Sequence, residues 1–294
     1  MVLAAAQWLL LAGAALIAGL PAESFAEGEC RRIVSLAPSV TETLFGIGLG
    51  DHVVGRTKFC RYPPVAEAIP PVGGFFDPSV EMIVSLKPSH VVALKESLPA
   101  VEALGRLGIP VLVVDHSSVR GIQESIRTLG AACGVSARAE ALLEALRARE
   151  ERVRAGLGQL AHTTRTLVVV GRAKEGSQVT SLYVSGSDGF YSDVLRLAGA
   201  QNVNEKPTVS IPIVSPEGLR ALNPDAVVEI VSEDDEPEGE QGAPLLPRLL
   251  SQYGGPKKPV FVLSDDFASV PGPRYIELVE KLAALLHGEL GAGE

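Results

Sequence analysis

The stretch VEMIVSLKPSHVVAL, residues 80–94, has a second copy later in the chain. The copy is PEGLRALNPDAVVEI, residues 216–230, and it aligns with the first at a constant offset of 136. Glu81 matches Glu217, and a leucine, a proline and two valines that follow also match. Each copy is typical of a short helix, a proline turn and an apolar strand. Two copies predict two similar lobes, because the period is too long for a solenoid.

Strand and helix alternate from residue 31 to residue 134. Short β-branched runs, such as RRIVSLAP at 31–38 and HVVAL at 90–94, predict strands, and the segments between them predict helices. Ser39 with Glu42 three residues later predicts a capping box at the start of the first helix. This alternation predicts an N-terminal α/β lobe with a parallel sheet.

A long segment without proline, SARAEALLEALRAREERVRAGLGQLA at 136–161, follows this lobe. It is rich in strong helix formers, its leucines recur at helical intervals, and Ser136 is a candidate cap. Alternation resumes with TLVVVG at 166–171, so residues 165–294 predict a C-terminal α/β lobe. The predicted fold class is therefore α/β, with two parallel-sheet lobes joined by one long helix.

Residues 1–26 have the pattern of a signal peptide. WLLLAGAALIAGL at 8–20 is apolar but short for a membrane span, and Ser24 and Ala26 suit a cleavage site. The alternative is a buried helix at the start of the chain. The acidic residues before Cys30 argue against a lipid anchor there. We therefore expect a periplasmic protein that is cleaved after about Ala26.

The charge distribution argues against nucleic-acid binding, and the absence of catalytic motifs argues against an enzyme. The formal charge is −9, and the basic residues are spread along the chain. The sequence lacks the G-x-S-x-G, phosphate-loop and H-E-x-x-H motifs, and it predicts no cofactor. His116 with Asp115, Asp265 and Asp266 is a conceivable metal site at equivalent strand ends. The favoured alternative is that these side chains cap the following helices, so no metal site is predicted.

Aromatic side chains gather on the loops that follow the predicted strands. Eight of the thirteen Phe and Tyr residues lie there, namely Phe59, Tyr62, Phe75, Phe76, Tyr183, Phe190, Tyr191 and Phe267. Ligands of parallel sheets bind beyond the carboxyl ends of the strands, so this clustering favours a large, flat and partly apolar ligand. For any single aromatic residue, packing in the core is an equally good interpretation.

Several stretches together resemble a known family. They are RIVSLAPSVTETLFGIGLGDHVVG at 32–55, CRYPP at 60–64, VGGFFDP at 72–78 and the two repeated stretches. From about Arg31 onward, the chain is similar to the cobalamin and iron-siderophore periplasmic binding proteins of ABC importers. The resemblance implies two α/β lobes bridged by one rigid helix, with the ligand in the cleft between them and no catalysis.

The resemblance also implies a docking role for the paired glutamates. In the family, one glutamate on each lobe docks on arginines of the membrane permease, and the matching positions here are Glu81 and Glu217. The residues alone have a plainer interpretation, because an acid in the first turn of a helix complements the helix dipole. We expect both roles, with an ABC permease dimer as the partner and a monomeric binding protein.

The expected ligand is a metal chelate, with a corrinoid first and a ferric siderophore second. CRYPP resembles the cobalamin branch, where an aromatic residue near Tyr62 lies against the corrin, whereas Arg61 and Arg274 suit an anionic siderophore. Haem is disfavoured, because residues 73–75 lack the tyrosine iron ligand of haem-binding relatives. The expected ligand-binding residues are Phe59, Cys60, Tyr62, Phe75, Phe76, Tyr183, Asp266, Phe267 and Arg274.

Export places three cysteines in an oxidising compartment, where they cannot all pair with one another. Cys30 precedes the first predicted strand, and Cys133 ends a crossover helix that returns the chain to the strands' starting side. We therefore expect a Cys30–Cys133 disulfide. Cys60 is then either a buried free thiol or a soft contact to a metal centre.

Two other classes of function stay open on the sequence alone. One is a metal-dependent hydrolase that uses the same cleft, and the other is a sensor or scaffold protein built from the same lobes. Stoichiometric zinc, or turnover by the purified protein, distinguishes the hydrolase from a binding protein.

Overall fold

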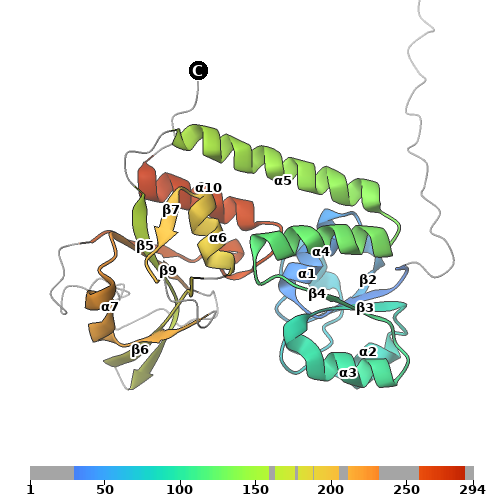
Figure 1. The fold of residues 1–294 in the computed structure, drawn as a ribbon. Helices are drawn as coiled ribbons and strands as arrows, with labels where there is room; N and C mark the ends of the chain where they lie inside the picture. The colour runs from blue at the N-terminus through green and yellow to red at the C-terminus, as the bar shows by residue number, and fades with distance from the viewer. Residues whose placement is uncertain are drawn as a thin grey trace, which may run out of the picture.

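The protein folds into two α/β lobes joined by one long helix, as the sequence predicts (Figure 1). The computed structural model describes residues 30–158, 163–175, 178–187, 189–204, 211–231 and 258–288. The predicted signal peptide lies outside these residues. None of the helices in the described ranges is both long and apolar enough to cross a membrane.

The N-terminal lobe contains a parallel sheet with the strand order β2-β1-β3-β4. Its strands are β1 (Ile33–Ser35), β2 (Val53–Arg56), β3 (His90–Leu94) and β4 (Val111–Val114). Its helices are α1 (Pro38–Gly46), α2 (Val80–Ser85), α3 (Leu98–Arg106) and α4 (Val119–Ala132). Short 3-10 turns are η1 (Gly50–His52), η2 (Pro64–Ala68) and η3 (Lys95–Ser97). Valine and isoleucine dominate the strands because β-branched side chains pack well on a pleated surface.

The C-terminal lobe repeats this arrangement and extends it. Its strands are β5 (Thr164–Glu175), β6 (Gln178–Val184), β7 (Ala200–Asn202), β8 (Ile213–Val214), β9 (Ala226–Ile230) and β10 (Val260–Leu263). Its helices are α6 (Phe190–Leu197), α7 (Pro216–Leu222), α9 (Asp266–Ser269) and α10 (Tyr275–His287). β7, β5, β9 and β10 pair in parallel, in the order of the first lobe. β6 and β8 are antiparallel additions, so this sheet is mixed and not wholly parallel as expected.

The repeated stretch folds in the same way in both lobes. Ser79 and Ser215 are the N-caps of α2 and α7, and each accepts a 3.2 Å hydrogen bond from the backbone N–H three residues later. The chain leaves each helix through a left-handed residue, Lys87 (φ 48°) or Asn223 (φ 43°). These matched ends confirm that one structural unit is used twice.

The predicted capping box at the start of α1 is wrong. The helix begins at Pro38, and Ala37 is the N-cap without a side-chain hydrogen bond. Proline suits the first helical position, because its fixed φ matches the helix and its missing N–H would have had no partner there. Ser39 and Glu42 therefore lie inside the helix, and Glu42 makes its contact with the other lobe instead.

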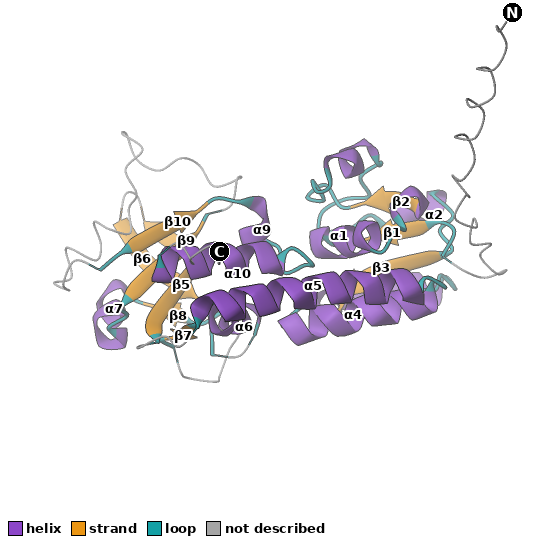
Figure 2. Ribbon diagram, turned by 90° about the horizontal axis from the view of Figure 1, so that it is seen from above, coloured by secondary structure: helices purple, strands orange, loops and turns teal. Residues whose placement is uncertain are grey.

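The long helix α5 (Ser136–Leu157) runs beside both lobes, with α4 along one half and α10 along the other (Figure 2). Val135 is its N-cap, so the predicted cap by Ser136 does not form. The helix ends earlier than expected, because Gly158 leaves it with a φ of 53°. One hydrophobic cluster extends from Val40 through α5 to Tyr275, so both lobes share a core beneath this helix.

A disulfide joins Cys30, in front of β1, to Cys133 at the end of α4. The two Cα atoms are 5.0 Å apart, and both residues are fully buried. Within the described ranges, Cys60 is the free cysteine, and it is also buried. The disulfide therefore ties the first strand of the N-terminal lobe to its last helix.

Candidate ligand-binding cleft

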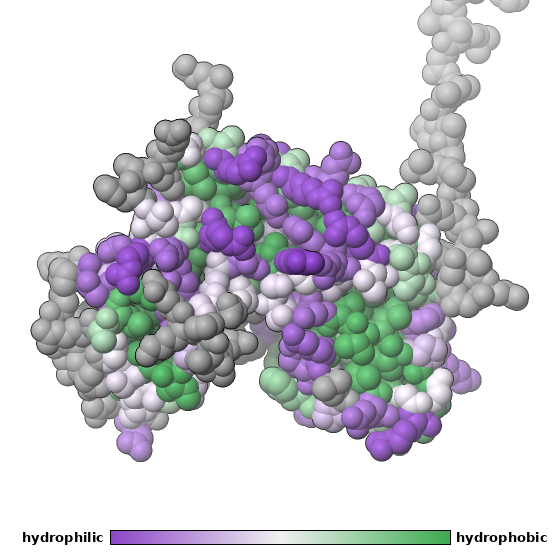
Figure 3. Space-filling view, in the orientation of Figure 1, coloured by the Kyte–Doolittle hydropathy of each residue, from purple (hydrophilic) through white to green (hydrophobic). Residues whose placement is uncertain are grey.

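A cavity of about 760 Å³ opens between the two lobes, on the side away from α5 (Figure 3). Both lobes line it through the segments that follow the carboxyl ends of their strands. Six of the nine residues expected to bind ligand lie on its wall, namely Phe59, Tyr62, Phe75, Phe76, Asp266 and Arg274. This volume is within the range of sites for small molecules and cofactors.

The other three expected residues do not line the cavity. Cys60 is fully buried with its sulfur 3.1 Å from Thr57 Oγ1, and burial raises the pKa of the thiol. Tyr183 lies within strand β6, where it pairs with Ile213, because the β-branched run around it extends the sheet. Phe267 packs against the shared core. The structure therefore places Cys60 and Tyr183 off the cavity wall, whereas the Phe267 ring stays close to the site, with 6.0 Å between its centroid and the guanidinium carbon of Arg274.

Exposed aromatic rings form the rim of the cavity. Phe75 and Phe76 pack edge to face with ring centroids 4.8 Å apart, and Phe76 is 89% exposed. Phe59 and Tyr62 come from the loop after β2 and are 41% and 40% exposed. Phe190, at the start of α6, lines the wall that belongs to the other lobe, but it is buried with 6% of its surface exposed and is not part of the exposed rim. Gathered exposed rings of this kind favour a broad and partly apolar partner.

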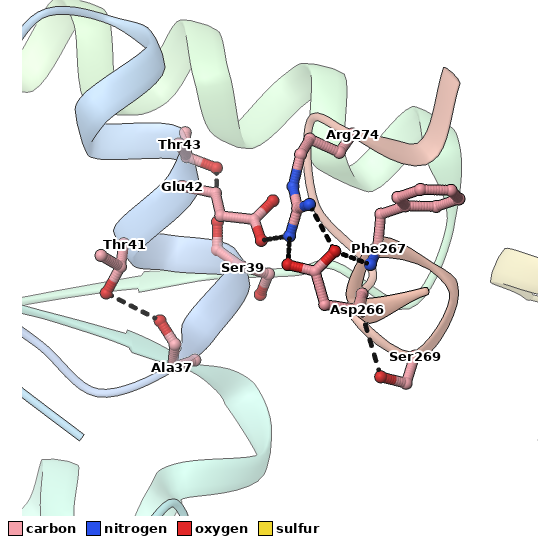
Figure 4. Close-up of polar contacts among 9 residues, drawn as sticks. All are labelled: Ala37, Ser39, Thr41, Glu42, Thr43, Asp266, Phe267, Ser269 and Arg274. Atoms are coloured by element: carbon pink, nitrogen blue, oxygen red, sulfur yellow. Dashed lines mark hydrogen bonds and ion pairs between the residues drawn. The ribbon is translucent and has the colours of Figure 1, made fainter. Parts of the chain in front are cut away.

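The guanidinium of Arg274 joins the two lobes at the floor of the cavity (Figure 4). Its Nη1 and Nη2 donate to the two carboxylate oxygens of Asp266 at 2.8 and 2.9 Å. Nη2 also donates to Glu42 Oε1 at 2.6 Å, and Glu42 belongs to α1 of the N-terminal lobe. The ring of Tyr62 covers the guanidinium, with 3.7 Å between the ring centroid and the guanidinium carbon.

Burial and pairing set the charges in this network. Glu42 is only 5% exposed, and burial raises the pKa of its carboxyl to about 7 although the bond from Arg274 opposes the rise. The hydrogen bonds from Arg274 lower the pKa of Asp266. Asp266 is therefore an anion at neutral pH, whereas the carboxyl of Glu42 changes between its protonated and ionised forms near pH 7.

The positions of His116 and its neighbouring acids do not support the metal-site hypothesis. His116 Nδ1 is 2.8 Å from Ser39 Oγ, and burial lowers the pKa of the imidazole to about 4. Asp115 and Asp265 each pair with a lysine, at 2.9 and 2.5 Å. In the part of the chain that the structure describes, no group of three His, Cys, Asp or Glu side chains is placed to hold a metal ion.

The two matched glutamates occupy equivalent places on the lobes. Glu81 is an exposed residue in the first turn of α2, and Glu217 is the second residue of α7. Both helices lie on the far side of their lobes from α5, one on each lobe (Figure 1). The fold thus places one acid on each lobe, away from the linking helix.

Residues 33–241 match the family whose description is "Periplasmic binding protein". The chain belongs to this family. A substrate-binding lipoprotein of an ABC transporter from Bacillus subtilis is 30% identical over 266 residues, which is 88% of this chain and 81% of that protein. The family consists of binding proteins rather than enzymes, so this chain is a substrate-binding protein of an ABC transporter.

Relatives of this binding protein differ in the ligand that they carry. A vitamin B12-binding protein from Pectobacterium carotovorum is 26% identical over 271 residues, which is 89% of this chain and 92% of that protein. A haem-binding protein from Roseiflexus has a TM-score of 0.75 at 24% identity, over 89% of this chain and 100% of its own. The vitamin B12-binding protein of Vibrio cholerae has a TM-score of 0.70 at 23% identity, over 87% and 96%. Both solved structures show the shared fold.

Two polar residues of α1 were missed as site residues at the level of sequence. Ser39 and Glu42 line the cavity, although their spacing favours a capping box. A signal was present, because both residues follow the carboxyl end of β1, where ligands of parallel sheets bind. The local capping pattern matched the same residues and concealed this signal.

Proposed function

We propose that this binding protein captures a corrinoid in the cleft and delivers it to an ABC permease. The observation that carries the proposal is the aromatic rim, where rings from both lobes line one space of about 760 Å³. A corrin macrocycle is broad and partly apolar, so aromatic side chains can cover its faces. The 26% identity to a vitamin B12-binding protein along 89% of the chain supports the same class of ligand.

A ferric siderophore or haem is the second candidate. Haem-binding proteins have the same fold, so the fold alone does not separate these ligands. The loop Gly73-Gly74-Phe75 offers no tyrosine as an iron ligand, which counts against haem. A corrinoid does not require an iron ligand at that position, because it would be held by contact with the aromatic rim.

Delivery to the permease uses Glu81 and Glu217. The equivalent positions of these acids on the two lobes support the role, since a two-fold permease offers two equivalent binding sites. The place of action is the periplasm, and the signal-peptide pattern of residues 1–26 supports export. The protein acts there as a monomer, with one ligand in each cleft.

Calorimetric titration of the purified mature protein tests the ligand assignment. The ligands are cobalamin, cobinamide, haem and a panel of ferric siderophores, and we expect saturable binding of a corrinoid. Tyrosine fluorescence is an independent readout, because the single tryptophan, Trp8, lies in the predicted signal peptide. Binding of a siderophore or haem alone would replace the corrinoid, and binding of none would remove the proposal.

A further inference from the structure

The arginine at the floor of the cleft is already occupied by carboxylates of the chain itself. Each carboxylate oxygen of Asp266 accepts a hydrogen bond from one terminal nitrogen of Arg274. Glu42 accepts a further hydrogen bond from Nη2. Asp266 therefore accepts the two parallel N–H bonds that the guanidinium would otherwise offer to a ligand carboxylate. The Arg274 side chain is 10% exposed and lies under the Tyr62 ring, so little of it remains for a further partner.

The other charges on the cavity wall do not restore a positive field. Among the described lining residues, the acids Glu42, Glu96, Asp265 and Asp266 outnumber the two arginines, Arg61 and Arg274. Lys281 offsets Asp265 at 2.5 Å, whereas Glu96 is exposed in the turn after β3. An anionic group that enters the cleft therefore meets carboxylates of the same sign at several points.

We infer that the cleft selects ligands that present uncharged hydrogen-bonding groups, such as carboxamides, to Asp266 and Arg274, and that it rejects ligands that present carboxylates there. This inference rests on the proposed function, because it concerns the ligand of the same cleft. Asp266 is the residue that sets the preference, since its carboxylate holds the position that a ligand carboxylate would need.

The geometry gives a reason for each half of this preference. The Asp266 side chain is 40% exposed, so its oxygens can accept hydrogen bonds from an amide N–H of a ligand. A ligand carboxylate has no proton to donate, and it would be repelled by Asp266 while the terminal nitrogens of Arg274 stay engaged. Replacement of Asp266 by asparagine reverses both effects, because it removes the negative charge, leaves one acceptor oxygen for the two Arg274 donors and adds an amide N–H from which a ligand carboxylate can accept a hydrogen bond.

A matched pair of corrinoids tests the inference. Cobinamide carries carboxamides around the corrin ring, whereas cobyrinic acid carries carboxylates on the same ring. We expect the wild-type protein to bind cobinamide at least about tenfold more tightly than cobyrinic acid, which is the scale of one charged hydrogen bond. Asp266→Asn should reduce this ratio of dissociation constants by about tenfold.

Glu96→Gln is the control variant, because it removes one negative charge from the same cavity without freeing an arginine. A clearly smaller change of the ratio in Glu96→Gln supports the role of Asp266. An equal change in both variants would overturn that role, since the general field of the cleft would then explain the preference. The ratio is measured on one preparation of each variant, so a loss of folded protein affects both ligands alike.

Failure of this inference is distinguishable from failure of the proposed function. Equal binding of the two corrinoids, or tighter binding of cobyrinic acid, would overturn the inference and leave corrinoid binding in place. If neither corrinoid binds, the proposed ligand is wrong, and haem with its dimethyl ester then forms the second pair. Because a methyl ester has no N–H to donate, tighter binding of the ester supports the rejection of carboxylates, whereas tighter binding of haem, or binding of neither, overturns the inference.

Discussion

The guanidinium carbon of Arg274 lies 3.7 Å from the centre of the Tyr62 ring. Tyr62 belongs to a loop of the N-terminal lobe, and Arg274 directly precedes helix α10 of the C-terminal lobe. The ring thus covers an ion pair that joins the lobes at the floor of the cleft. One side chain thereby contributes both to the wall of the cavity and to the contact between the lobes.

Replacement of Tyr62 by alanine should weaken ligand binding. The variant removes an aromatic surface from the rim and exposes the Arg274 ion pair to water, so we expect about tenfold weaker binding of cobinamide. Tyr62→Phe keeps the ring and should stay within about threefold of the wild type. Calorimetric titration measures both variants. Equal affinities of the alanine variant and the wild type would exclude a contact between Tyr62 and the ligand.

Glu42 should make the protein less stable as the pH rises. Burial raises the pKa of its carboxyl from an ordinary value of 4.5 to about 7 in the folded protein. Between pH 4.5 and 7, Glu42 is therefore protonated in the folded state and ionised in the unfolded state. The free energy of unfolding therefore falls as the pH rises through this window, by at most about 3 kcal/mol. Urea unfolding of Glu42→Gln should lack this fall, and an unchanged fall would contradict the assignment.

His116 should have the opposite effect on stability. Its pKa is lowered from an ordinary 6.5 to about 4 by burial, so the unfolded state binds the extra proton between these values. The free energy of unfolding therefore falls as the pH drops below 6.5. His116→Gln should remove this loss of stability at low pH, and it should leave the loss of stability at high pH that Glu42 causes. Glu42→Gln should thus change the pH dependence of the free energy of unfolding in the opposite direction to His116→Gln. A change in the same direction in both variants would refute the pair of assignments.

Loss of the Cys30–Cys133 disulfide should destabilise the N-terminal lobe. The bond spans a sequence separation of 103, and a loop of this length stabilises the folded state by roughly 4–5 kcal/mol in the chain-entropy model. We expect this loss in the double variant Cys30→Ser, Cys133→Ser, measured by chemical unfolding. Cys60→Ala is the control, because it removes a buried thiol and leaves the disulfide intact. A larger loss in the control would show that packing, and not the cross-link, dominates.

Charge reversal at both Glu81 and Glu217 should abolish ligand uptake by cells without weakening ligand binding by the purified protein. In the proposed docking mode, opposite charges at these positions would repel the arginines expected on the permease, and Glu81 is not among the described residues that line the cavity. The control is the same reversal at Glu144 and Glu151 on α5, which faces away from α2 and α7. Normal uptake by the first variant would remove the docking role.

The two-lobe architecture could be predicted because its signals are local. The repeat at residues 80–94 and 216–230 contains its own caps, proline and strand, so each copy specifies its own helix and turn. The long helix follows from a segment without proline that is rich in helix formers. The hairpin of β5 and β6 differs from the expectation, since the sequence pattern predicts that Tyr183 lies on a loop beyond the end of a parallel strand.

The sequence by itself determined the lobes, the linking helix and the gathering of aromatic residues near the strand ends. Only the tertiary structure decided that Glu42 and Arg274, 232 positions apart, meet in one buried ion pair. No local pattern encodes such a meeting, because burial and charge pairing depend on neighbours through space. The same contact turned Arg274 from a candidate anion binder into a residue that the protein's own carboxylates neutralise.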